Sequence, residues 1–329
     1  MDIAGGKFVI TGGASLIGSH VADHLLAAGA GEVVLLDNFS LGTPEAVAHL
    51  ATDARARLVK GDILRVNELF DAFKGAAGVF SIAGFLTLPL SQNPSLGLAV
   101  NVEGQVNVFE ACRYAGVRKV VFSSSIAAYG EPQGEGLIDE TAPANLAGYQ
   151  PGSMLYSCSK LIGEALCRLY TQKHGIEAVA LRYSTVYGER QHYRGVNALA
   201  IIESYDRVRA GQPPVLPGDG SEVHDYIHVA DVARANVMAM ASEHSGVFNV
   251  ATGVETTVKR IAEIVLDLCD SALQPVYRDD PDAVKATASR SLRLSREKIR
   301  AAIGWEPQVS VEDGIARLIG WIREQERGA

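Results

Sequence analysis

Cysteine is scarce in this 329-residue sequence. Its four cysteines are widely spaced and form no CxxC pair: Cys112, Cys158, Cys167 and Cys269. Because paired cysteines build most disulfide frameworks and structural zinc sites, neither is expected here. His20 and His24 lie four residues apart, but Val21 follows His20, so the HExxH zinc motif is missing as well. We therefore expect no metal at the functional site.

Long apolar runs and clusters of positive charge are also missing. No run of about 18 residues is apolar throughout, and the N-terminal residues lack the basic region, apolar run and cleavage site of a signal peptide. The formal net charge is −8, and no cluster of Lys and Arg offers the surface that nucleic-acid phosphates require. These absences predict a cytoplasmic protein that binds neither membrane nor nucleic acid.

Short apolar segments do recur, and they alternate with longer segments of helical periodicity. Several are apolar on both faces, as strands are in a parallel sheet that is covered on two sides. The expected strands carry the sequences KFVIT, EVVLLD, ARLVKGD, GVFSIAG, RKVVFSSS and EAVALRYS. The pattern predicts an α/β fold with a doubly wound parallel sheet of the Rossmann type.

The turn after the first expected strand has the spacing of a dinucleotide-binding loop. Gly12, Ser15 and Gly18 form the pattern G-x-x-S-x-x-G. Gly12 permits a tight turn, the central position lets the backbone approach a pyrophosphate, and Gly18 lets helix and strand come close. Ser15 stands where a glycine is usual. The loop can hold this small side chain if its φ is negative, and the hydroxyl could donate to phosphate.

A carboxylate ends the second expected strand. Asp37 lies where a side chain can accept hydrogen bonds from the adenosine ribose hydroxyls. No Lys or Arg follows in residues 38–42, so a ribose phosphate would meet repulsion, and NAD is favoured over NADP. Gly61, Asp62 and Ile63 follow the third strand and are expected to flank the adenine.

A tyrosine and a lysine four residues apart supply a candidate catalytic pair. Tyr156 and Lys160 share one face of an expected helix. A tyrosine titrates near 10, but a neighbouring ammonium and a nicotinamide charge stabilise its phenolate. Tyr156 could then remove a proton from a substrate hydroxyl while a hydride passes to NAD. Ser125 ends the fifth strand at the carboxyl edge of the sheet and would bind the same oxygen.

Further motifs follow in a consistent order along the chain. They are NVEGQVNVFEAC around Asn101, LRYSTVYGERQ at 181–191, PGDGSEVHDYIHVADVARA at 217–235, FNVATG at 248–253 and IGWEPQVSVEDGI near the C-terminus. Together with the loop and the Tyr–Lys pair, they resemble the extended short-chain dehydrogenase/reductase family over nearly the whole chain. The resemblance is specifically to its NAD-dependent sugar epimerase/dehydratase branch.

The resemblance implies that the chain forms two domains with different roles. Residues 1–187 would bind NAD, and residues 188–329 would mainly form a smaller substrate-binding lobe, with a segment near 223–252 returning to the first domain. Ser125, Tyr156 and Lys160 would be catalytic. A homodimer would form through the helices at 95–115 and 155–173. Additional NAD contacts are expected at Leu16, Ile17, Asn38, Ala83 and Asn101, and Tyr156 and Lys160 are expected to contact NAD as well.

The sequence departs from this family mainly in the substrate half. His224 stands where the epimerases usually carry an arginine for the substrate diphosphate, and Thr185 stands where an asparagine is frequent. A histidine near neutral pH is only partly charged. Arg190 and Arg290 are candidates to supply positive charge, so the expected substrate contacts are Thr185, His224, Arg190 and Arg290. Ser81 also replaces a histidine, at the end of the fourth strand.

These observations favour one function and leave two alternatives. Ile126 and Ala127 follow Ser125, where 4,6-dehydratases carry an Asp-Glu pair, so dehydration is disfavoured. The first hypothesis is an NAD-dependent epimerase of a nucleotide-diphosphate sugar, similar to the UDP-hexose 4-epimerases. The second is an NAD-dependent dehydrogenase or reductase of another hydroxyl or ketone substrate. The third, a non-catalytic NAD-binding regulator, is opposed by the presence of Tyr156 and Lys160.

Overall fold

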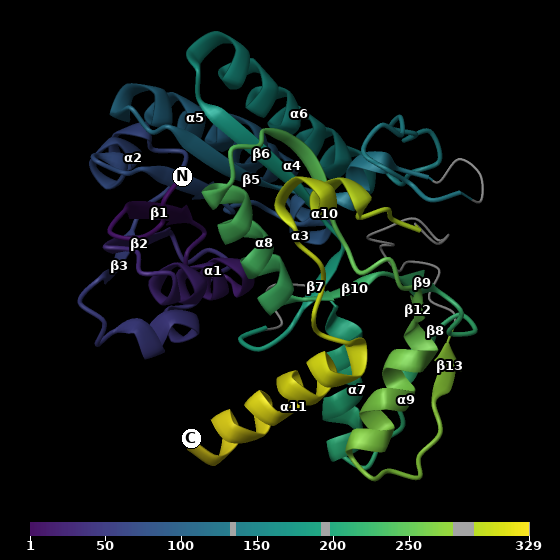
Figure 1. Cartoon of the computed structure of the whole chain (residues 1–329). Coiled ribbons are helices and arrows are strands. Elements are labelled where there is room, and N and C mark those ends of the chain that lie inside the picture. The colour runs from purple at the N-terminus through teal and green to yellow at the C-terminus, as the bar shows by residue number, and fades with distance from the viewer. Residues whose placement is uncertain (132–135, 192–197, 279–292, 329) are drawn as a thin grey trace.

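The computed structural model describes residues 1–131, 136–191, 198–278 and 293–328. Its centre is a seven-stranded sheet in the order β11-β6-β5-β4-β1-β2-β3, in which all neighbouring strands run parallel (Figure 1). The strands are β1 (Lys7–Thr11), β2 (Glu32–Asp37), β3 (Ala56–Lys60), β4 (Gly78–Ser81), β5 (Lys119–Ser125), β6 (Glu177–Tyr183) and β11 (Gly246–Val250). The predicted fold class is confirmed, and every strand expected from the sequence pattern forms.

Helices cover both faces of this sheet. Successive strand residues point to opposite faces, so Phe8 and Ile10 pack in one core while Val9 packs in the other. The first core includes α1 (Leu16–Ala27), α8 (Val229–Ala241) and α10 (Glu297–Ile303). The second includes α2 (Val66–Phe73), α5 (Gly104–Ala115) and α6 (Pro151–His174). The edge strand β3 differs from the expectation of two apolar faces, because all of its residues are exposed or half-buried.

The segment expected as one helix near 95–115 is divided into three. It consists of α4 (Pro94–Leu98), a π-helical turn η2 (Ala99–Glu103) and then α5. Single π-turns of this kind occur frequently at functional sites. Short helices also follow β2, β4 and β5: η1 (Pro44–Leu50), α3 (Thr87–Gln92) and η3 (Ile126–Tyr129).

A smaller lobe lies beyond the sheet and has its own core. Its helices are α7 (Leu199–Arg209), α9 (Val258–Leu268) and α11 (Val311–Gly328), which lie together at the lower end of Figure 1. Three pairs of short strands accompany them: β7 (Thr185–Tyr187) with β10 (Tyr226–His228), β9 (Val223–His224) with β12 (Thr256–Thr257), and β8 (Val215–Pro217) with β13 (Val276–Arg278). Tyr205, Ile261 and Leu318 are buried between the helices. After β10 the chain passes through α8 into β11, at the edge of the large sheet.

The described ranges contain neither a membrane-spanning helix nor a cluster of metal ligands. No helix there is long and apolar enough to cross a membrane. Within the same ranges, no three His, Cys, Asp or Glu side chains gather in an arrangement suited to a metal ion.

Candidate active site

The candidate cofactor site lies where the strand order of the sheet reverses, between the carboxyl ends of β1 and β4. Gly12, directly after β1, has φ +69°, and a Cβ atom there would lie 2.9 Å from the backbone nitrogen of Ala83. A Cβ atom on Gly18 would lie 2.2 Å from the Gly12 carbonyl oxygen. Both positions therefore require glycine, the first for its backbone conformation and the second for the close approach of α1.

Ser15 is the N-cap of α1. Its backbone is extended, with φ −96°, so the serine causes no strain. Its Oγ accepts a hydrogen bond from the backbone nitrogen of Gly18 at 3.2 Å and donates one to the Gly12 carbonyl oxygen at 2.6 Å. The hydroxyl thus satisfies an otherwise unbonded N–H of the helix. Because its hydrogen is used inside the loop, the side chain offers no donor to a phosphate in this conformation.

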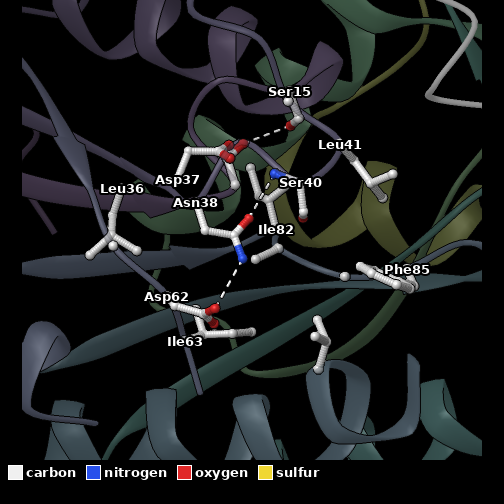
Figure 2. A pocket seen from close by; sticks show the side chains of 16 residues that line it. Ser15, Leu36, Asp37, Asn38, Ser40, Leu41, Asp62, Ile63, Ile82 and Phe85 are labelled. Carbon is white, nitrogen blue, oxygen red and sulfur yellow. Dashed lines mark hydrogen bonds between the residues drawn. The ribbon is translucent and has the colours of Figure 1, made fainter. Parts of the chain in front are cut away.

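The loop opens into a groove across the ends of β1, β2, β3 and β4, shown in Figure 2. Eight of the expected cofactor residues line it: Gly12, Ser15, Asp37, Asn38, Gly61, Asp62, Ile63 and Ala83. Asn38 Nδ2 donates to Asp62 Oδ2 at 3.1 Å and so joins the ends of β2 and β3. The groove is therefore continuous from the pyrophosphate loop to the expected adenine position.

Asp37 is oriented by two backbone amides. Its Oδ2 accepts from the Ala14 nitrogen at 2.9 Å and its Oδ1 from the Phe39 nitrogen at 2.8 Å. Burial raises the pKa of the Asp37 carboxyl, and these two hydrogen bonds oppose that shift. Each oxygen keeps a second lone pair that can accept a ribose hydroxyl. No Lys or Arg is among the described residues that line the groove, whereas Asp37 and Asp62 are.

Sequence reasoning missed part of the groove and named residues outside its lining. The missed lining residues in the segments that follow β2 and β4 are Ser40, Leu41, Gly42, Ile82, Gly84 and Phe85. Their position after strand ends is the signal that could have found them. Leu16 and Ile17, the first residues of α1, are outside the lining and pack against the first core, and their contacts with NAD stay predictions. Asn101 bonds both the backbone nitrogen and the carbonyl of Phe85, which positions the segment after β4.

The candidate catalytic residues meet at the end of β5. Ser125 is the last residue of that strand, and its hydroxyl is hydrogen-bonded to Tyr156 of α6. Burial raises the pKa of Tyr156 to about 12, while the hydrogen bond from Ser125 opposes this shift. A phenol with this pKa is protonated at neutral pH, so Tyr156 needs nearby positive charge to act as a base.

Lys160 supplies positive charge one helical turn from Tyr156. Its Nζ lies 5.5 Å from the centre of the Tyr156 ring and donates to the Ser123 carbonyl oxygen at 2.9 Å. Burial lowers the pKa of Lys160 to about 8, and the charge of Glu164 opposes the shift. A Cβ atom built on Gly84 would lie 3.6 Å from Lys160 Nζ. Because Gly84 lines the groove, the catalytic candidates stand directly beside the cofactor site.

Comparison with known proteins agrees with this geometry. The sequence matches the NAD dependent epimerase/dehydratase family over residues 8–251. The chain belongs to that family. The UDP-glucose 4-epimerase of Mycolicibacterium smegmatis is 32% identical over 324 residues, which span 97% of this chain and 99% of that protein.

Two solved structures of family members extend the comparison. The UDP-glucose 4-epimerase of Thermotoga maritima with UDP-glucose has a TM-score of 0.86 at 28% identity, covering 97% of this chain and 99% of that one. The UDP-glucose 4-epimerase of Thermus thermophilus in complex with NAD has a TM-score of 0.82 at 32% identity, covering 96% and 99%. The family's cofactor, NAD, fits the groove described above, since Gly12 and Gly18 leave room for a close backbone approach and the Asp37 carboxylate lines the groove at the end of β2.

One departure from the family pattern has a structural explanation. Ser81, at the place of the family's histidine, donates from Oγ to Gln105 Oε1 at 2.6 Å. Gln105 Nε2 in turn donates to the Ala83 carbonyl oxygen at 2.9 Å. The serine and glutamine together hold the segment after β4 against α5, so this part of the cofactor groove is supported without a histidine.

Two of the expected substrate contacts are neighbours in the smaller lobe. Thr185 begins β7, and its nitrogen donates to the carbonyl oxygen of Asp225, the residue after His224. His224 Nε2 lies 2.9 Å from Glu222 Oε1. Sequence reasoning overlooked Asp225, whose buried carboxylate accepts from Ser184 Oγ at 2.8 Å.

The other two expected contacts are placed differently. Arg190 adopts a positive φ of 66° and pairs with Asp23 on α1, so its guanidinium is bound to the cofactor helix. Arg290 lies outside the described residues. The roles of all four in substrate binding stay predictions.

Proposed function

We propose that this protein is an NAD-dependent 4-epimerase of a UDP-hexose. The observation that carries the proposal is the position of Ser125, Tyr156 and Lys160 beside the dinucleotide groove. Similarity to UDP-glucose 4-epimerases over almost the entire chain supports the same substrate class.

The proposed chemistry uses the three residues in distinct roles. NAD, when bound, supplies the acceptor and later the donor of a hydride. Tyr156 Oη takes the proton of the sugar 4-hydroxyl, and Ser125 Oγ hydrogen-bonds the same sugar oxygen. Lys160 holds a positive charge near the Tyr156 ring and so favours the phenolate. Tyr156 would return the proton to the same sugar oxygen in the second half of the cycle.

The cofactor assignments belong to the same proposal. Gly12 and Gly18 admit the pyrophosphate to the N-terminus of α1, Asp37 binds the adenosine ribose, and Asp62 with Ile63 flanks the adenine. The two carboxylates and the lack of a lining Lys or Arg in the described part of the groove support NAD over NADP.

We also propose a cytoplasmic homodimer. One exposed face of α6 is formed by Cys158, Ile162, Ala165 and Leu169. Their spacing of four, three and four residues makes a continuous, mostly apolar stripe, as a helix–helix interface requires. All four cysteines are free, as is usual in a reducing compartment.

One observation favours a second candidate, net oxidation or reduction of a different substrate. His224 is engaged by the carboxylate of Glu222, which lowers the net positive charge at the position proposed for a substrate diphosphate. A pocket of this charge would suit a less anionic substrate than a nucleotide sugar.

The decisive experiment incubates NAD-loaded protein with UDP-galactose and follows both UDP-glucose and NADH absorbance. Conversion without accumulation of NADH is the expected result. Accumulation of free NADH would replace the epimerase proposal with the dehydrogenase. In parallel, calorimetric titration with UDP and with UDP-glucose measures binding; no binding of either nucleotide would contradict the nucleotide-sugar assignment.

A further inference from the structure

Three consecutive serines end β5, and each is bonded to a different polar residue of α6. The contacts are Ser125 with Tyr156, the Ser123 carbonyl with Lys160, and Ser124 with Glu164. The three α6 residues are spaced by four, so they lie on one face of the helix in successive turns. Of these three residues, Tyr156 and Lys160 are catalytic candidates, whereas Glu164 has no part in the proposed chemistry.

Glu164 accepts three hydrogen bonds in the interior of the protein. Ser124 Oγ donates to its Oε1 at 2.6 Å, and Arg182 of β6 donates through Nε and Nη2, each at 2.7 Å. The exposed fractions of the Glu164 and Arg182 side chains are only 9% and 8%. The Arg182 guanidinium also lies 4.4 Å from the centre of the Tyr129 ring of η3.

A buried ion pair of this kind is poorly explained by stability alone. Removing two charges from water has a large desolvation cost, and apolar replacements of equal volume are often no less stable. What the pair does provide is a fixed geometry, because the forked guanidinium binds a carboxylate in one orientation. It therefore sets how α6 lies against both β5 and β6.

We propose that Glu164, held by Ser124 and Arg182, is a positioning residue of the catalytic centre. It fixes the register of α6 against the end of β5, so that Tyr156 and Lys160 reach Ser125 and the Ser123 carbonyl. Glu164 also places a negative charge on α6 one helical turn after Lys160. The inference rests on the proposed function for the meaning of the catalytic residues, but its geometry is independent of the substrate.

The charge of Glu164 has a defined consequence for Lys160. Burial lowers the pKa of Lys160, and the Glu164 carboxylate raises it again, which preserves the ammonium near neutral pH. The other titratable side chains linked to this row are Tyr156 and Cys167 on α6, Tyr183 of β6, which is bonded to Ser123, and Tyr129, whose ring faces the Arg182 guanidinium. Burial raises the pKa of the Cys167 thiol, and the charge of Glu164 adds to that shift. If the Glu164 carboxylate were lost, Lys160 and Arg182 would be two buried cations without its compensating negative charge.

Two variants and one matched control test the proposal. Glu164→Gln removes the charge and keeps the size, and Ser124→Ala removes one hydrogen bond while retaining the ion pair. The control is Asp231→Asn in α8. Asp231 is 2% exposed and pairs with Arg234. Its carboxylate also accepts hydrogen bonds from the backbone nitrogens of Gln308 and Val309. Asp231 is therefore a buried, paired carboxylate like Glu164, but it lies on the opposite face of the sheet from α6.

The readouts are kcat, KM and their pH profiles for UDP-galactose with NAD-loaded protein. Glu164→Gln should lower kcat about 10-fold and change KM by less than about 3-fold. In the plot of kcat against pH, it should also shift the low-pH limb to higher pH by on the order of one pH unit. The shift follows because a less protonated Lys160 stabilises the Tyr156 phenolate less well. Ser124→Ala should lower kcat about 3-fold in the same way. Asp231→Asn should reduce stability and leave the limb in place.

A second readout needs no sugar. The ultraviolet difference absorbance of tyrosinate, with Tyr156→Phe as the blank, titrates the Tyr156 phenol in NAD-loaded protein. An unchanged Tyr156 titration in Glu164→Gln, or an equal shift in Asp231→Asn, would overturn the proposal. If Glu164→Gln does not fold, Ser124→Ala decides by the same criterion. Failure of wild-type protein to convert UDP-galactose would refute the proposed function, while the phenol titration still tests the role of Glu164.

Discussion

Ser15 and Gly12 close the cofactor loop through a hydrogen bond of 2.6 Å from the serine hydroxyl to the glycine carbonyl oxygen. The same carbonyl oxygen lies where a Cβ atom on Gly18 would clash. The hydrogen bonds of Ser15 therefore stay inside the loop: the serine that replaces the usual glycine bonds the protein backbone and not a ligand. Its contribution should appear in the stability of α1 more than in the affinity for the cofactor.

The first prediction separates these two effects. Ser15→Ala should lower the free energy of unfolding by about 1 kcal/mol, because the N-cap of α1 is lost, whereas Ser15→Gly should cost only a few tenths of a kcal/mol. Affinity for NAD should change less than about 3-fold in either variant. Urea unfolding and calorimetric titration with NAD measure both quantities. A loss of about 10-fold in NAD affinity in Ser15→Ala alone would show instead that the hydroxyl binds phosphate.

The second prediction concerns the cofactor's ribose. Asp37→Ala should weaken NAD binding by about 10-fold to 100-fold, because hydrogen bonds from the ribose to a charged acceptor are lost. It should also narrow the preference for NAD over NADP, since a negative charge next to the ribose phosphate is removed. Titration with both dinucleotides tests this. Asp71→Asn, an exposed residue of α2, is the control and should alter neither affinity.

The third prediction concerns the proposed base. Tyr156→Phe should lower kcat by about 100-fold to 10,000-fold and leave NAD affinity within about 3-fold. The reason is that phenylalanine keeps the aromatic ring and removes only the hydroxyl that is proposed to take the proton. Turnover of UDP-galactose and titration with NAD are the two measurements. Retention of most of the activity would exclude Tyr156 as the base.

Much of this site is visible in the sequence because it depends on local spacing. The strand–loop–helix order around Gly12, the strand end at Asp37 and the helical spacing of Tyr156 and Lys160 are all short-range patterns. The structure confirms the fold that they predict, and it places these residues around one groove.

Long-range pairings are what the sequence conceals. Arg190 reads as a substrate contact because it is a cation near the end of a motif, yet its partner, Asp23, is 167 residues away in α1. Glu164 shows no motif at all, because its importance comes from Ser124 and Arg182 on two other elements. Such pairs depend on how helices lie on the sheet, and no local pattern encodes that.

The fourth prediction tests the proposed homodimer. Ile162→Asp places a charge in the apolar stripe of α6 and should convert the dimer to a monomer, because a buried charge without a partner is costly. Leu58→Asp on β3 is the matched control, since Leu58 and Ile162 are both 41% exposed. Light scattering or sedimentation reports the mass. A dimer that survives Ile162→Asp would require an interface elsewhere.

The fifth prediction concerns a carboxylate that joins the cofactor helix to the smaller lobe. Glu189 Oε2 lies 3.1 Å from Nε2 of His228 and 3.8 Å from Nε2 of His20. Burial by itself raises the pKa of Glu189, but these two histidines outweigh it and hold the pKa well below its usual range. Burial lowers the pKa of His20, with Glu189 opposing and Arg190 adding to that shift.

Both shifts make the folded state sensitive to acid. Because the pKa of Glu189 is depressed on folding, its stabilisation is complete above about pH 4.5 and is lost as the pH falls toward the folded value. His20 adds a loss of stability that begins below about pH 6.5, since the unfolded chain takes up the proton first.

Glu189→Gln should therefore lower the free energy of unfolding by about 1 to 3 kcal/mol at pH 7, and the difference from wild type should shrink below about pH 4.5. Urea unfolding at several pH values measures it, with Glu312→Gln, in an exposed pair with Arg260, as the control. A constant difference across that range would mean that Glu189 acts by packing and not by its charge.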